Sequence, residues 1–164
     1  MNISKINSPN FQARMDISNV KKYRYYWQEV ADNFAKKTAG KDEIVTLQEE
    51  IYGLREFKVT TSKKRCLGYI IYDKNDALIN EPPQIAAKKI SQVFNKFMKV
   101  TTEWDNSAND DVNKIFEENN DKLITVKTLR DLFERALTKK EQMKNDINSK
   151  LSNSKDLNGF KIII

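Results

Sequence analysis

The sequence contains no histidine, one cysteine and four glycines. Histidine is the usual general base near neutral pH and a common zinc ligand, so its absence removes Ser–His and Cys–His nucleophilic pairs and most zinc sites. One cysteine cannot build a Cys-only zinc or iron–sulfur site within the chain. The glycines are scattered and form neither a phosphate-binding loop nor a dinucleotide fingerprint. Nothing selects a catalytic pair among the 23 acidic residues, so we expect no enzyme activity and no cofactor.

Segments that would direct the chain to a membrane or a secretory route are also missing. The first residues, MNISKINSPNFQARMD, lack the apolar core of a secretory signal. No segment approaches the roughly 18 apolar residues of a membrane-spanning helix. Cys66 has no second cysteine to pair with, which fits a reducing compartment. We expect a cytoplasmic protein with no membrane span, although a polar leader rich in Ser and Asn is also compatible with non-classical export.

The positive charge is modest and evenly distributed. The chain has 29 basic and 23 acidic side chains, a net charge of +6. Residues 1–80 contain 14 basic and 10 acidic side chains, and residues 81–164 contain 15 and 13. A basic chain favours acidic partners, but nucleic-acid-binding domains usually concentrate their charge in one stripe. The charge is therefore either functional or the result of a general compositional bias.

The clearest β pattern lies in the first half of the chain. Cys66–Tyr72 (CLGYIIY) is short, apolar and rich in β-branched and aromatic residues, which predicts an inner strand. Glu56–Thr60 alternates polar and apolar residues, as a half-buried strand does. Ser62–Arg65 would form the hairpin turn between these two strands.

The segment before these strands has two interpretations. As a strand, Glu43–Glu50 buries Val45 and Leu47; as a helix, residues 43–54 place apolar side chains at spacings of three and four. We favour the strand, because Gly53 would weaken a helix and suits a turn. The result is a small antiparallel meander between about residues 43 and 72, which needs helices to cover one face.

Helical spacing predicts an α-helix on each side of the meander. Ser18 or Asn19 is the expected N-cap of the first helix, which would run to about Thr38. Pro82-Pro83 would open the second helix, where a missing N–H costs little, and that helix would run to about Glu103. The fold class is therefore α+β.

The last third of the chain is predicted to contain two further helices. Asp105–Asp111 (DNSANDD) is expected to be a polar loop, followed by a short helix from Asp111 to Glu118. Thr125 would cap a long helix from Val126 to about Leu151. Residues 145–158 are too polar for close packing, and we expect them to project or fray.

The expected organisation is one domain. Residues 1–17 are predicted to be extended or disordered, residues 18–151 to form a single α+β domain, and residues 152–164 to form a polar linker with an apolar C-terminal tail.

The leading functional hypothesis is a non-enzymatic protein-interaction module. It would bind another protein, whose identity the sequence does not indicate, through an exposed helix or through the apolar tail. In that tail Phe160, Ile162 and Ile164 are costly to leave exposed, so the tail should either dock back as an edge strand or bind a partner.

The alternative hypothesis is a nucleic-acid-binding protein. Residues 110–150 read as helix, short turn and helix, the shape of a helix-turn-helix motif. In that reading Lys127 and Arg130 would contact phosphate or guanine. A second basic cluster, Lys63, Lys64 and Arg65, lies at the predicted hairpin turn and is a candidate contact for an acidic partner.

The turn before Thr125 loosely resembles a calcium-binding EF-hand loop. Lys122 stands where the sharp turn needs glycine, and Thr128 stands where a bidentate glutamate is required. We therefore expect no metal site there.

Overall fold

The structure is a computed structural model that describes residues 13–37, 42–48, 55–72, 78–120, 125–152, 157 and 159–164. Its elements are β1 (Arg14–Asp16), α1 (Arg24–Lys37), β2 (Ile44–Leu47), β3 (Arg55–Thr60), β4 (Cys66–Tyr72), α2 (Pro83–Glu117), α3 (Val126–Ser152) and β5 (Phe160–Ile163). The strands form one sheet in the order β1-β2-β3-β4-β5, in which β1 and β2 are parallel and the other neighbours are antiparallel. The fold is mixed α and β, as the sequence predicts.

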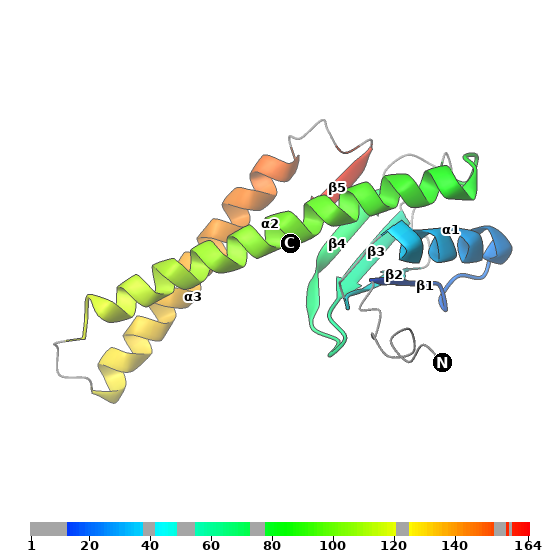
Figure 1. The fold of residues 1–164 in the computed structure, drawn as a ribbon. Helices are drawn as coiled ribbons and strands as arrows, with labels where there is room; N and C mark the ends of the chain where they lie inside the picture. The colour runs from blue at the N-terminus through cyan, green and yellow to red at the C-terminus, as the bar shows by residue number, and fades with distance from the viewer. Residues whose placement is uncertain are drawn as a thin grey trace, which may run out of the picture.

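The core lies between one face of the sheet and the helices α1 and α2 (Figure 1). Phe57 and Ile70 of the central strands are fully buried there. Trp27 of α1 packs edge-on against Phe57, with ring centroids 6.3 Å apart. Phe34 of α1 meets Phe94 of α2 at 5.5 Å. This interdigitation of large side chains fixes α1 and the first half of α2 on the sheet.

The predicted central strands are confirmed. β4 runs from Cys66 to Tyr72 and has a neighbour on each side, and β3 alternates buried and half-buried residues. The ambiguous segment is a strand in its described part, Ile44–Leu47, whereas residues 49–54 lie outside the described residues. The turn at residues 62–65 is confirmed, and Lys64 adopts a φ of 64° within it.

The predicted three-stranded meander is too small, because the sheet has a further strand at each edge. β1 pairs in parallel with β2, and α1 forms the crossover between them. Residues 14–16, which are expected to be extended or disordered, have the extended conformation of a strand and belong to the sheet, whereas residues 1–12 lie outside the described part of the chain. Three residues are too few to display an alternating pattern, although Met15 is buried as a strand residue would be.

The first helix begins at Arg24, later than predicted. The candidate cap Ser18 instead belongs to a turn, in which its N–H donates to Oδ1 of Asp16 at 2.9 Å. Tyr23 has a φ of 57°, a value that interrupts any helix arriving from residues 18–22. A helix-capping residue type alone therefore does not locate a helix start, because the same side chains also stabilise turns.

The predicted polar loop at residues 105–111 and the separate short helix after it are wrong. α2 is one helix of 35 residues that includes both segments. Its inward face continues through Trp104, Ala108 and Val112, at spacings of four, and Ala108 is fully buried. The Asn, Asp and Ser residues of this segment point mostly to solvent. Tertiary packing against α3 thus outweighs their weak helix propensity.

The end of α3 is more ordered than predicted. α3 runs to Ser152, Leu151 is buried, and Asn148 exchanges two hydrogen bonds with the backbone of Ile164, at 2.9 and 3.0 Å. The projecting tail is therefore wrong for residues 145–152, whereas residues 153–156 and 158 lie outside the described residues. Thr125 is the predicted N-cap: its Oγ1 accepts from the N–H of Thr128 at 3.2 Å.

Candidate protein-interaction surface

The second half of α2 and the first half of α3 extend beyond the sheet as a helical hairpin (Figure 1). α2 is about 52 Å long, at about 1.5 Å per residue. Its first half covers the sheet with large residues such as Phe94 and Phe97. Beyond Trp104, α3 is the element that covers its inward face. The projecting part is thus a layer of two helices.

A single partner helix cannot cover the apolar arc of α3. Leu132 and Ala136 face inward and are each 6% exposed. Because an α-helix turns by 100° per residue, Phe133 and Leu137 are rotated away from that direction. Phe133 is 53% exposed and Leu137 is 66% exposed, and Val126 continues the same stripe toward the helix start with 79% exposure. The helix has one apolar side for α2 and another that faces solvent.

Phe116 of α2 joins this second side. Its ring meets the ring of Phe133 edge-on, with centroids 5.5 Å apart. Leu129 lies between the inward and outward directions and is 38% exposed. We call the resulting surface the apolar hairpin face; its members are Phe116, Val126, Leu129, Phe133 and Leu137.

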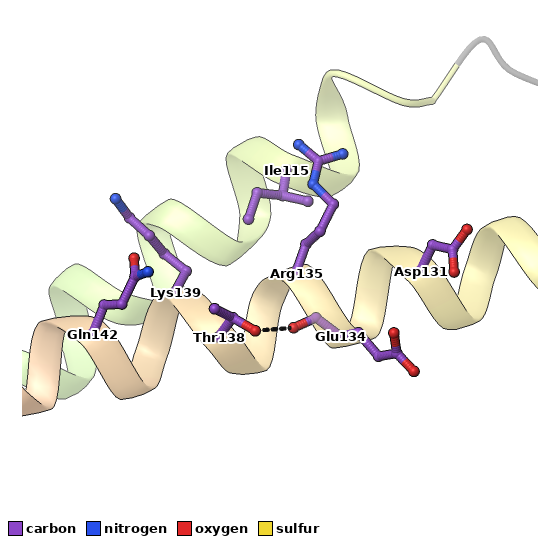
Figure 2. Close-up of a pocket in the computed structure, with 7 residues that line it drawn as sticks. All are labelled: Ile115, Asp131, Glu134, Arg135, Thr138, Lys139 and Gln142. Carbon is purple, nitrogen blue, oxygen red and sulfur yellow. Dashed lines mark hydrogen bonds between the residues drawn. The ribbon is translucent and has the colours of Figure 1, made fainter.

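The opposite side of α3 is polar. Figure 2 shows a shallow groove there, in which Arg135 and Lys139 extend toward α2 near Ile115. Glu134 points away from α2 in the same view, and its carbonyl oxygen accepts a hydrogen bond from Oγ1 of Thr138 at 2.9 Å. The remaining lining residues are Asp131 and Gln142. Charges of both signs line this groove, so it does not select a ligand class.

A more enclosed cavity of about 350 Å³ lies at the base of the hairpin, among residues from α2, α3, β4 and the loops next to them. Glu43 is buried there, and its Oε2 accepts no hydrogen bond from the described residues. Nε1 of Trp104 is also buried, and it has no acceptor in the described part of the chain. Nζ of Lys144 lies 5.8 Å from the Trp104 ring centroid, a cation–π contact that ties α3 to α2. The cavity contains both a buried acceptor, Oε2 of Glu43, and a buried donor, Nε1 of Trp104, so it also does not indicate one class of ligand.

The predicted basic residues fall into two separate groups. Lys63 and Lys64 are exposed in the β3–β4 turn, and Arg65 lines the cavity at the hairpin base. Lys127 and Arg130 are exposed in the first turns of α3, at the far end of the hairpin. The structure therefore does not join the two groups into one basic surface.

The described parts of α2 and α3 differ in form from the helix-turn-helix on which the nucleic-acid hypothesis rests. α2 and α3 are two long helices lying side by side in a hairpin, not a short helix followed by a recognition helix (Figure 1). The end of α2 is also acidic: residues 105–118 contain five acidic side chains and one lysine. These carboxylates would repel phosphates close to Lys127 and Arg130. Nucleic-acid binding remains a prediction that no structural observation tests.

The apolar tail docks back on the sheet, as predicted for one of its two alternatives. β5 pairs antiparallel with β4, and Phe160, Ile162 and Ile164 are buried. The ring centroids of Phe160 and Tyr72 lie 4.6 Å apart. These side chains belong to the core, so a partner can reach them only if β5 leaves the sheet.

Helical spacing alone does not reveal the apolar hairpin face, because spacing does not tell which apolar positions of the last helix are covered by α2. A signal was available in the width of the arc. Apolar residues at 126, 129, 132, 133, 136 and 137 span more of the helix circumference than one neighbouring helix covers.

No described helix is long and apolar enough to cross a membrane. Within the described residues, no group of three or more Cys, Asp or Glu side chains is arranged to hold a metal ion. No family model matches the chain, and no curated protein or solved structure matches it.

Proposed function

We propose that this chain is a non-enzymatic protein-interaction module and that the apolar hairpin face is its binding surface. The observation that carries the proposal is the solvent-exposed stripe on α3. Soluble proteins rarely expose several large apolar side chains together, and contiguous patches of this kind mark interaction sites. Leu132 and Ala136 of the same helix are buried, so the exposed stripe does not result from loose packing of α3.

The stripe has the spacing of helix-to-helix recognition. Val126, Leu129, Phe133 and Leu137 follow one another at intervals of three, four and four residues. An amphipathic helix uses these intervals when it binds a groove or another helix. A partner helix lying along the stripe would complete a small helical bundle with α2 and α3.

The surface is also well supported. α2 is continuous from the sheet to the hairpin end, so it transmits the rigidity of the core. The start of α3 is fixed by reciprocal hydrogen bonds between Thr125 and Thr128, at 2.8 and 3.2 Å. Binding would therefore lose little conformational entropy in the hairpin itself, which favours affinity.

Site-specific photo-crosslinking tests the proposal. A photo-activatable amino acid replaces Leu137 in one version of the protein and Tyr25 in a control version, because Tyr25 is 93% exposed on α1. After irradiation in native lysate, we expect discrete crosslinked products from position 137 and none from position 25. Adding Phe133→Ser should abolish the products at 137. Equal labelling at both positions, or none at 137, would show that the hairpin face binds no protein.

A further inference from the structure

We propose that the apolar hairpin face binds a second copy of this chain, with the two α3 helices packed antiparallel about a two-fold axis. The inference rests on the proposed function and names its partner. It follows from two properties of the surface together: the two ends of the stripe, Val126 and Leu137, exchange places under a two-fold rotation about its midpoint, and the charges beside it are complementary to themselves under the same rotation.

The stripe defines where the axis passes. It begins at Val126 and ends at Leu137, so its midpoint lies between residues 131 and 132. A two-fold axis at this point places Val126 of one copy opposite Leu137 of the other. Phe133 of the first copy then falls opposite residue 130 of the second copy, and its ring packs between Leu129 and Phe133 of that second copy. Every exposed apolar residue of the stripe gains an apolar neighbour in this register.

The charges beside the stripe satisfy the same register. Arg130 and Glu134 lie on one flank of the stripe, on the side away from Leu132, because positions four apart share a helix face. A two-fold rotation brings this flank against the same flank of the second copy. Glu134 then falls opposite residue 129 of the second copy, between Lys127 and Arg130. Opposite charges meet twice, once on each side of the axis.

These side chains are available for such contacts. Arg130 and Glu134 are exposed, and within the described part of the chain neither forms a salt bridge. Figure 2 shows Glu134 directed away from α2, whereas Arg135 and Lys139 extend toward it. Glu134 is thus not engaged in holding the hairpin together.

The arrangement also leaves room for both sheets. Leu137 lies about 16 Å of helix axis before Asn148, where α3 first bonds to the C-terminal strand segment. The end of the second hairpin occupies this interval. Its acidic residues Glu117 and Glu118 come beside the segment that contains Lys140 and Lys144. Attraction between these segments favours the antiparallel orientation over the parallel one, which would bring like ends together.

Analytical ultracentrifugation of the full-length chain, over a concentration series from micromolar to millimolar, tests the inference. We expect a reversible dimer. Arg130→Glu and Glu134→Arg should each weaken it roughly tenfold, because each replaces two opposite-charge contacts by like-charge contacts. The double variant Arg130→Glu with Glu134→Arg should restore the wild-type dissociation constant. Tyr25→Ser, which removes an exposed aromatic residue elsewhere, should leave dimerisation unchanged.

Mixing the two single variants gives a sharper readout. In Arg130→Glu, positions 130 and 134 are both acidic, and in Glu134→Arg both are basic. The two variants should therefore bind each other more tightly than either variant binds itself. Circular dichroism melting curves establish that every variant is folded.

Three results would overturn the inference: a monomer at every concentration, a dimer insensitive to the single charge reversals, or a double variant that is no better than the singles. These results leave the proposed function standing if position 137 still crosslinks to a different protein. A monomer that also gives no crosslink at 137 would refute both proposals.

Discussion

Replacing Gly68 by alanine should strongly destabilise the protein, because β5 lies directly against this residue. A Cβ atom at position 68 would sit 2.2 Å from the carbonyl oxygen of Ile163 and 3.0 Å from both Cα of Ile164 and a ring carbon of Phe97. The first contact involves backbone, which cannot rotate away as a side chain can. Gly68 also has a φ of +150°, a conformation that only glycine adopts readily.

The expected loss has two parts. The backbone conformation costs about 1–3 kcal/mol for a residue with a Cβ atom. Overpacking against β5 costs about 1–3 kcal/mol more. We therefore expect Gly68→Ala to lower the free energy of unfolding by about 2–6 kcal/mol, a large share of the about 5–15 kcal/mol typical of a domain. For a chain of 164 residues this corresponds to a melting temperature lower by about 4–24 °C.

Urea unfolding followed by tryptophan fluorescence measures this loss. Gly159→Ala is the matched control, because Gly159 also has a positive φ, of 90°. We expect the control to lose about 1–2 kcal/mol from its backbone conformation alone. Amide hydrogen exchange should in addition be faster in β5 of the Gly68 variant. If Gly68→Ala costs no more than the control, β5 does not pack on Gly68, and the C-terminal residues are again candidates for partner binding.

Two further predictions test the hairpin and the helix contacts of the core. Leu132→Ala should lower the free energy of unfolding by about 2–3 kcal/mol, because the Leu132 side chain is 6% exposed. Leu137→Ala should lower it by less than about 0.5 kcal/mol, because Leu137 is 66% exposed. Equal losses for the two variants in urea unfolding would contradict the orientation of α3. The Tyr26 hydroxyl donates to the carbonyl oxygens of Leu78 at 2.6 Å and Glu81 at 2.9 Å, so Tyr26→Phe should cost about 1–2 kcal/mol. Burial, with the nearby Glu81 carboxylate, raises the pKa of Tyr26 to about 12. Between pH 10 and pH 12 the unfolded chain therefore releases this proton while the folded chain retains it, and stability falls as the pH rises. That fall should be smaller in Tyr26→Phe than in a Tyr25→Phe control, and identical pH profiles would refute it.

The sequence predicts the centre of the sheet well because its residues contain the pattern in themselves. Cys66–Tyr72 is apolar along its whole length, and Glu56–Thr60 alternates, so both strands are visible without tertiary information. The edge strands are different. β1 has three residues, and β5 is recognisable only as an apolar tail whose destination depends on the sheet edge formed far away in the chain.

The helical hairpin was harder to predict because local and tertiary preferences disagree in residues 105–111. Asn, Asp and Ser weaken a helix in isolation, so a loop is the reasonable local interpretation. The burial of Ala108 and the partial burial of Trp104 and Val112 along one face of α2 show that tertiary packing decides otherwise. Once α2 is known to continue to Glu117, it can be seen that α3 has more apolar residues than α2 can cover. The uncovered ones form the candidate surface.

The connection between β4 and β5 supports a role for the hairpin beyond folding. Tyr72 and Phe160 are partners in the ladder, so the end of β4 lies beside the start of β5. A turn of two to five residues would join two such strands. The chain instead runs through residues 73–159, in which the first half of α2 and the end of α3 are the helical parts, among the described residues, that cover the sheet or its edge.

In the described residues of the projecting segment beyond Trp104, no side chain belongs to the core between the sheet and the helices. It nevertheless exposes Phe133 and Leu137, which favour aggregation when they have no partner. An excursion that the sheet does not need, and that carries an unfavourable exposed surface, supports the proposal that the hairpin serves recognition and that the sheet with α1 is its rigid support.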